Sequence, residues 1–522
     1  MEGPRLVVPV VPSEEDVLEG MLTRRFQYAK GIQGSSRYHS IFRTKSRWEL
    51  IRLSLLIVGI EFTFATESAF VAPILLGMGL PHTLMTMMWA MSSIIGVLFV
   101  PIVASKSDRL RAKWGRRRPV LLALGVAMLL GLLLIPRGRL VGEAIGLRSM
   151  AWGAALTTIG VMITDPSAGA SIGLCRTYAM EVCTIGDQSR VLSTMMLIGG
   201  LGGSLGFLFG AVDWRALPIG EYFTSDESAV FTANWILLLV GLLSTLTSFP
   251  EIPLPVQERD ELLRPVTKRA LKNKLQRLRG DVHEVQTELH MDIIGFRQFV
   301  RNVIRMPRAM RILCATQCLT NMGHLTFCLN FTDFVASTVF DGDVQAPPES
   351  LEFVLYQQGV RFACFGMALY LASASLSSLL IEKATKRVGA RAVYVTGLMA
   401  HCVGMLSVGF LHYRAVVLLC CSLAGIMYAT VYSIPILLIS HYHSKNSFDV
   451  VDGKCVESTE PRGFGADVSI LNSILCIAQV CPNVTPFHGI VLTLLFSYPK
   501  LCISIITRGY TVNHFARDGR TD

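Results

Sequence analysis

The feature that most constrains the fold is a series of apolar runs, each about as long as a membrane-crossing helix. A helix needs about 20 apolar residues to cross roughly 30 Å of hydrocarbon. Runs of this kind lie near 50–77, 84–104, 119–136, 149–170, 190–212, 230–249, 308–337, 359–381, 390–411, 415–440, 463–481 and 489–507. With 51% hydrophobic and only 16% charged residues, the chain is too apolar for a soluble protein of this length. The sequence predicts an all-α membrane protein with about twelve spanning helices.

The apolar runs form two groups, separated by a charged and helix-prone stretch. We expect a cytoplasmic tail at 1–47, a first six-helix half at 48–249, a cytoplasmic linker with an amphipathic helix at 250–307, a second half at 308–507 and a tail at 508–522. No short apolar stretch with a small-residue cleavage site precedes the first span. That span is therefore expected to direct insertion and to stay in the mature protein.

The loop charges predict the orientation in the membrane. Loops on the cytoplasmic side carry an excess of Lys and Arg. The basic loops are 106–118 and 383–391, and the acidic ones hold Asp213, Glu221, Asp226 and Glu227 or Asp341, Asp343, Glu349 and Glu352. The loop after the third span is an exception, because it holds Arg137, Arg139 and Arg148. Both termini are therefore expected in the cytoplasm, and the net charge of +10 reflects topology rather than nucleic-acid binding.

Several other classes of function are excluded by what the sequence lacks. The thirteen cysteines are scattered, mostly in apolar runs, without Cys-x-x-Cys spacing, so we expect small buried hydrophobes rather than disulfides or metal ligands. The sequence has no nucleophile elbow, metal cluster or nucleotide-binding loop. We therefore expect neither an enzyme nor a bound cofactor.

The two strongly basic loops occupy equivalent places, after the second helix of each half. The first begins with Asp108 and Arg109 and ends with Gly115, Arg116, Arg117 and Arg118, and the stretch from Lys386 to Arg391 repeats it in shortened form. Parallel repetition of a six-helix unit, with the substrate site between the halves, is the organisation of major facilitator carriers. We expect the named residues of the first loop to form a gate on the cytoplasmic side.

Ionisable residues inside spans mark substrate or proton pathways, because each costs about 2.5–3.5 kcal/mol to insert. Glu61 and Glu67 lie in the first span, roughly 120° apart around the helix and about 9 Å apart along it. They are not expected to point at one spot. Asp165 and Arg176 lie on one face of the fourth helix, about 16 Å apart, and can line one cavity at two depths.

The second half carries fewer such groups. Asp333 on the seventh helix and Arg361 on the eighth both lie toward the outer side, where they are read either as a charge pair or as residues that cap helix ends among the headgroups. His324 is read as a hydrogen-bonded core residue or as a proton carrier. Tyr428 and Tyr432 on the tenth helix are read as packing residues or as a surface that stacks on a sugar ring. The glycines of the fifth helix, from Gly199 to Gly210, predict close helix packing.

Several of these motifs together resemble the animal solute carrier 45 family, which is similar to plant sucrose–proton symporters. The motifs are Gly79-Leu-Pro-His-Thr83, Trp89, the loop from Ser107 to Pro119, Asp165 with Arg176, Phe331-Thr-Asp-Phe334, Tyr356-Gln-Gln-Gly-Val-Arg361 and Gly463-Phe-Gly-Ala-Asp467. The resemblance covers roughly residues 47 to 479 and implies a major facilitator fold with proton-coupled sugar uptake and no cofactor. Two departures are Pro166, Gly169 and Ile172 after the fourth-helix Asp, and the stretch after Gln479, where Pro482 and Pro486 interrupt the pattern.

The resemblance also implies roles for individual residues. Proton coupling is expected at Asp165, Glu61 and Glu67, and substrate binding at Arg176, Asp333, Arg361 and His82. The leading hypothesis is a monomeric sucrose or hexose symporter in the plasma membrane or an organelle membrane, with sugar and protons as ligands. An organic cation or polyamine carrier is an alternative, given the intramembrane carboxylates. A second alternative is a non-transporting isoform that acts as a membrane interaction partner through its altered end.

Overall fold

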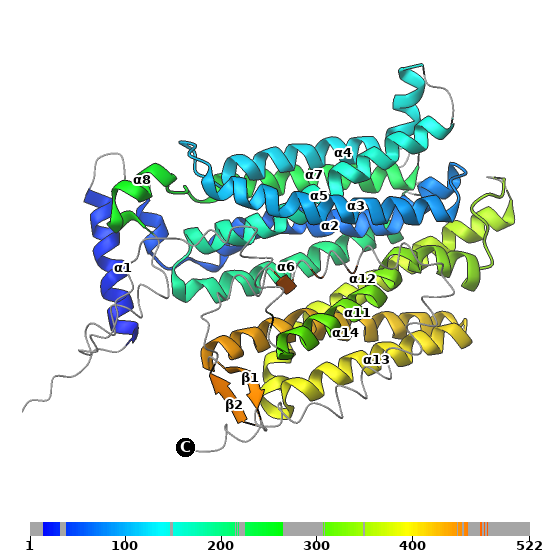
Figure 1. The fold of residues 1–522 in the computed structure, drawn as a ribbon. Coiled ribbons are helices and arrows are strands. Elements are labelled where there is room, and N and C mark those ends of the chain that lie inside the picture. The colour runs from blue at the N-terminus through cyan, green and yellow to red at the C-terminus, as the bar shows by residue number, and fades with distance from the viewer. Residues whose placement is uncertain are drawn as a thin grey trace, which may run out of the picture.

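The computed structural model of the chain consists of two side-by-side helical bundles (Figure 1). It describes residues 14–31, 38–146, 150–214, 216, 218, 225–264, 306, 308–347, 350–445, 447–451 and 454–457, with isolated positions at 470, 471, 474 and 478. The first bundle contains α2 (Arg47–Gly77), α3 (His82–Arg109), α4 (Arg118–Ala144), α5 (Met150–Val182), α6 (Ile185–Ala211) and α7 (Asp226–Ser248). The second contains α11 (Arg308–Phe334) with the π-turn η4 (Val335–Val339), α12 (Leu351–Val388), α13 (Ala390–Phe410) and α14 (Arg414–Lys445).

These ten helices coincide with the first ten predicted spans. Within the described part of the chain, eight of them are long and apolar enough to cross a membrane. The other two are α5, which carries Asp165, and α11, which carries Asn321 and His324. The last two predicted spans, and the predicted linker helix, lie outside the described residues, so the total of twelve stays a prediction.

Serine side chains define where three of the helices begin. Ser46 accepts a hydrogen bond from the amide of Glu49, and the Glu49 carboxylate accepts one from the amide of Ser46, which makes a capping box at the start of α2. Ser225 and Ser350 cap α7 and α12 in the same way through one bond each. The helix between such caps stays continuous because only a helix satisfies its own backbone in hydrocarbon.

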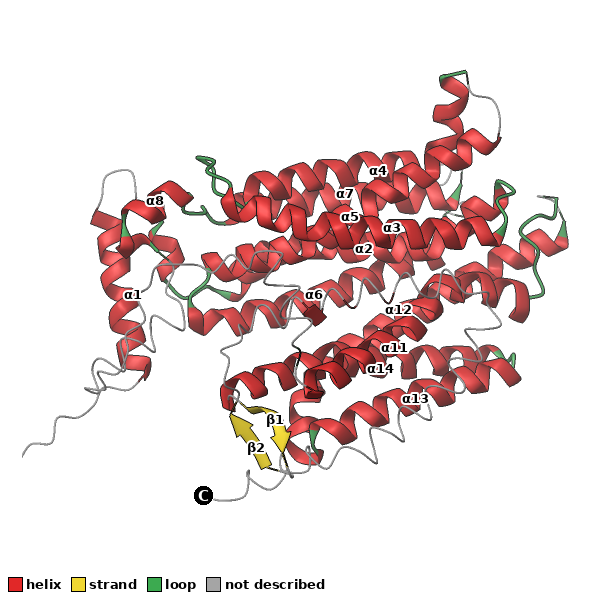
Figure 2. Ribbon diagram, viewed as in Figure 1, coloured by secondary structure: helices red, strands yellow, loops and turns green. Residues whose placement is uncertain are grey.

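Small secondary elements gather at one end of the two bundles. We call it the loop end, because the loop 110–117 between α3 and α4 lies there, and we call the opposite end the far end. At the loop end, α1 (Glu14–Gly31) lies across the spanning helices and packs with η1 (His39–Phe42), α8 (Leu254–Arg259) and η3 (Glu261–Leu263) (Figure 1). Figure 2 shows the two strands β1 (Ser447–Val451) and β2 (Lys454–Glu457), an antiparallel hairpin that the all-α prediction did not include.

Helix α6 packs against both α2 and α12 and so joins the two bundles. A side-chain carbon placed on Gly206 would lie 2.8 Å from Cβ of Ala65, so this position on α6 accepts only glycine without a shift of α2. On the facing side, the Ser204 hydroxyl donates to the carbonyl of Ala368 on α12 at 3.0 Å. The glycines of this helix therefore do allow close packing, as their spacing predicted.

Candidate functional site

The loop between α3 and α4 is held by a set of buried ion pairs, which we call the loop network. The guanidinium of Arg116 lies 2.7 Å from Glu181, near the end of α5. That of Arg117 lies 3.1 Å from the same carboxylate and 2.5 Å from Asp108. Both guanidinium groups are almost wholly buried. Removing one partner from such a group leaves an unpaired charge and costs about 3–5 kcal/mol, so the loop has one preferred position.

The backbone of the same loop is bound by Glu251, which follows α7. Its carboxylate accepts the amide of Arg117 at 2.9 and 3.0 Å and that of Arg118 at 3.3 Å. Burial raises the pKa of Glu251, and the nearby charge of Glu181 adds to the rise. Gly115 has a φ of 112°, and a side-chain carbon there would lie 2.7 Å from Cβ of Glu251. Only glycine therefore fits this turn.

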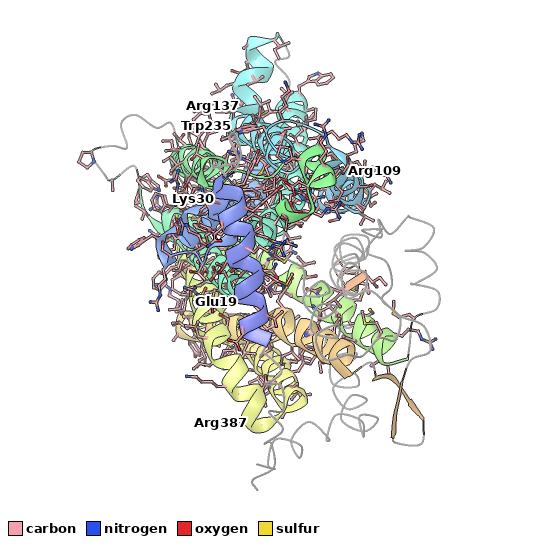
Figure 3. All side chains as sticks on the ribbon, turned by 90° about the vertical axis from the view of Figure 1, so that its left-hand side faces the viewer. Glu19, Lys30, Arg109, Arg137, Trp235 and Arg387 are labelled. Atoms are coloured by element: carbon pink, nitrogen blue, oxygen red, sulfur yellow. The ribbon has the colours of Figure 1, made fainter. Side chains whose placement is uncertain are left out.

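The predicted gate residues differ in how far they take part. Arg118 donates to the carbonyl of Leu246 and lies over the ring of Trp114, at 4.7 Å from its centroid. Arg109 is exposed on the surface of the first bundle (Figure 3), and none of the ion pairs described for the network includes it. In the described residues, every ion pair of the network joins elements of the first bundle. In the second bundle, Gly389 lies between α12 and α13 with a φ of 95°, at the place equivalent to Gly115. The side chains of Lys386 and Arg391 lie outside the described part of the structure.

Inside the first bundle lie three carboxyl groups that we call the carboxylate cluster: Glu61, Glu67 and Asp165. Asp165 on α5 accepts a hydrogen bond from the Ser92 hydroxyl of α3 at 2.6 Å. Glu67 is only 2% exposed, and neither of its oxygens has a hydrogen-bond partner among the described residues. Asp165 is a near neighbour of Glu67. A buried carboxylate oxygen without a partner is stabilised by a proton, which removes the charge, or by a donor from water or a ligand.

The two glutamates of α2 face different neighbours, in keeping with their separation around the helix. Glu61 faces α6, since a side-chain carbon on Gly199 would lie 3.3 Å from its Cγ. Glu61 and Arg176 are near neighbours, and both lie near Tyr428 of α14 in the second bundle. Glu61 therefore lies where the bundles meet, whereas Glu67 lies toward Asp165.

Aromatic and imidazole rings of the second bundle form an aromatic cluster beside this meeting point. His324 of α11 shares a hydrogen bond of 2.7 Å with the Tyr370 hydroxyl of α12. The ring of Tyr428 lies 5.2 Å from His324 and 4.4 Å from Tyr432, measured between centroids. His324 is thus hydrogen-bonded within the core, and a polar aromatic surface faces the carboxylate cluster through Tyr428.

At the far end, Arg361 of α12 binds two carboxylates of the first bundle, and we call the three residues the far-end triad. Its guanidinium lies 2.5 Å from Asp213, after α6, and 2.7 Å from Asp226, at the start of α7. The predicted pair between Arg361 and Asp333 is therefore wrong. Asp333 instead accepts the Tyr356 hydroxyl at 2.9 Å. Tyr356 and Arg361 are five residues apart, about 140° around the helix, and cannot both face α11.

Sequence reasoning missed several partners of the predicted residues. Glu181 and Glu251 carried no motif, and Asp213 and Asp226 were read only as markers of an outer loop. Ser92 and Tyr370 had no signal at all in a chain with many hydroxyl groups. Of the predicted substrate residues, His82 begins α3 at the far end, and its side chain lies outside the described part of the structure.

Three comparisons relate the chain to known proteins. Residues 56–251 match a family described as MFS/sugar transport protein. The membrane-associated transporter protein of Homo sapiens is 31% identical over 457 residues, which cover 83% of this chain and 86% of that protein. Proton-associated sugar transporter A of Homo sapiens is 24% identical, over 83% and 81% of the two chains. Solute carrier family 45 member 3 of Homo sapiens is 28% identical, over 76% and 70%.

Among solved structures, the xylose transporter XylE from E. coli in a partially occluded inward-open conformation superposes with a TM-score of 0.53. It is 13% identical, and the match covers 88% of this chain and 97% of that one. At that identity the likeness shows the fold, which is that of major facilitator carriers. The chain is therefore an integral multi-pass membrane protein and a transporter rather than an enzyme.

Proposed function

This chain belongs to the solute carrier 45 family of major facilitator transporters, and we propose that it carries a sugar, sucrose or a related disaccharide or hexose, together with a proton. The relative named proton-associated sugar transporter A supports this substrate pair. The observation that carries the proposal is the carboxylate cluster, which lies within the first bundle and whose Glu61 lies near Tyr428 of the second bundle.

The proton is taken up on the carboxylate cluster. Asp165 has one neutral donor, Ser92, and Glu67 has no hydrogen-bond partner among the described residues, so a proton or a sugar hydroxyl satisfies oxygens that are otherwise unpaired. Arg176, on the same helix as Asp165, acts on Glu61 and supplies positive charge when that carboxyl is ionised. The aromatic cluster offers ring faces and hydroxyl groups for the apolar and polar sides of a sugar ring.

Alternating access follows from the two ends. The far-end triad holds the bundles together at one side of the membrane, and opening that side breaks two ion pairs. The loop network stiffens the first bundle at the other side, so that this bundle moves as a rigid body. With the loop end in the cytoplasm, as the basic loops indicate, both termini are cytoplasmic and the described conformation is closed to the outside.

Uptake into proteoliposomes tests the proposal. A gradient of one pH unit supplies about 1.4 kcal/mol per proton, enough for about tenfold accumulation of sugar at one proton per sugar. Asp165→Asn and Glu67→Gln are expected to abolish the effect of the gradient on sucrose or glucose uptake. The matched control is Glu143→Gln, a carboxylate at the far end of α4 that pairs with Arg139 outside the cluster. Gradient-driven uptake that survives in Asp165→Asn would remove that residue from the mechanism.

An organic cation is the second candidate substrate, and the same cluster favours it. Three carboxyl groups against one arginine leave net negative charge when all are ionised. Competition assays separate the two candidates, because amines that block uptake where sugars do not would select the cation carrier.

A further inference from the structure

A hollow on the outer flank of the first bundle plays no part in the proposed transport mechanism. It lies between α4 and α7, is open to the surface, has a cavity volume of about 120 Å³, and is lined by Leu132, Pro136 and Arg137 on one side and by Phe231 and Trp235 on the other. Figure 3 shows Arg137 and Trp235 on the flank away from the second bundle. The surface around it is apolar, since Leu130 of α4 and Ile236 of α7 are more than half exposed. This flank faces lipid.

The hollow begins at the edge of the membrane and extends inward. Arg137 is nineteen residues beyond Arg118, where α4 begins, which is about 28 Å along the helix and close to the roughly 30 Å of a hydrocarbon core. Trp235 is nine residues into α7, about 14 Å from its far end. One mouth of the hollow is therefore at headgroup level and its floor is among the acyl chains.

The local sequence explains why a hollow forms here. Pro136 has no amide proton, so the carbonyl of Leu132 loses its helical hydrogen bond and this turn of α4 is disturbed. Trp235 then fixes the floor, because its indole donates to the carbonyl of Leu129 at 3.2 Å. The walls are apolar apart from Arg137 and Thr232, and the Thr232 hydroxyl already donates to the carbonyl of Ser228.

Arg137 is the one charged group at the mouth. In the described part of the chain it makes no ion pair, whereas Arg139, two residues further on, binds Glu143 at 3.0 Å. A guanidinium at the membrane edge extends to the headgroups and binds phosphate oxygens with two parallel hydrogen bonds. This also accounts for the one loop whose positive charge opposes the predicted topology.

We propose that this hollow is a phospholipid-binding site, in which Arg137 binds the phosphate and the first part of an acyl chain lies against Leu132, Phe231 and Trp235. The charge of Arg137 favours an anionic headgroup, such as phosphatidylglycerol, over a zwitterionic one. The lipid fills the gap left at Pro136 and holds α4 against α7. Its presence does not depend on which substrate is transported.

Lipid titration of the purified, delipidated full-length protein tests the site, with retained lipid read by native mass spectrometry and stability by thermal unfolding. Phosphatidylglycerol is expected to bind and to raise the unfolding temperature, while diacylglycerol, which lacks the phosphate, and inorganic phosphate, which lacks the chains, have no effect. Arg137→Gln is expected to weaken phosphatidylglycerol binding about fivefold, whereas Arg137→Lys retains most of it.

The matched control is Arg139→Gln, which removes an arginine from the same end of α4 without touching the hollow. The proposal is overturned if Arg137→Gln binds phosphatidylglycerol as tightly as the unmodified chain, or if Arg139→Gln loses as much. Stabilisation by inorganic phosphate alone would assign an anion site instead of a lipid site. Equal binding of diacylglycerol would show that the phosphate is not recognised.

Discussion

Replacing Arg361 by Gln is expected to open the far end of the two bundles. The substitution keeps a polar side chain but shortens it and removes the charge that binds Asp213 and Asp226. The pair with Asp226 is mostly buried and is worth about 1.5 kcal/mol, and the pair with the half-exposed Asp213 about 0.5 kcal/mol. Both exist only while the far end is closed. Their loss shifts the open-to-closed ratio by about thirtyfold, since about 1.4 kcal/mol corresponds to a factor of ten.

Distances between spin labels at the far end measure this ratio. Leu140 on α4 and Leu351 on α12 are exposed and belong to different bundles, so Leu140→Cys and Leu351→Cys provide suitable positions. We expect Arg361→Gln to move population from the short to the long distance. An unchanged distribution would refute the reasoning.

Arg414→Gln is the matched control for that experiment. Arg414 lies at the same end, and its guanidinium is 4.4 Å from the ring centroid of Phe340, so its contact stays within the second bundle. The Arg414→Gln substitution therefore removes one positive charge without removing a link between the bundles. If it opens the far end as much as Arg361→Gln, the effect comes from net charge and not from the triad.

Two further predictions concern the loop end. Gly115→Ala is expected to destabilise the protein by about 1–3 kcal/mol and to lower its unfolding temperature, because alanine is strained at a φ of 112° and its side chain meets Glu251. The control Gly146→Ala, at a φ of 88° in open space, is expected to cost less. Equal losses of stability in the two variants would argue against the contact with Glu251. Burial lowers the pKa of Lys45 to about 8, so the folded protein binds fewer protons than the unfolded one between pH 8 and 10.5, and stability rises with pH there by at most about 3 kcal/mol. Lys45→Met should abolish this rise in pH-dependent thermal unfolding, and an equally steep rise in the variant would contradict it.

The spans and the fold class were determined by local sequence. A run of about 20 apolar residues specifies a membrane helix because the helix alone satisfies the backbone in hydrocarbon. The tight turn at Gly115 and the glycines of α6 could also be predicted, since they depend on the local backbone and on the absence of a side chain. The intramembrane acids Glu67 and Asp165 stood out for a similar reason, because each is costly where it lies.

Which groups those residues meet was decided by the tertiary structure. Glu181 lies more than sixty residues from the arginines that it binds, and Arg361 finds its partners in the other bundle, 135 and 148 residues away. The spacing on α12 allowed either α11 or the first bundle as the neighbour of Arg361, and only the packing of the bundles chose between them. The hollow between α4 and α7 has the same origin. The sequence showed an arginine that did not fit the predicted topology, and only the approach of α7 to Pro136 and Arg137 made a site of this part of α4.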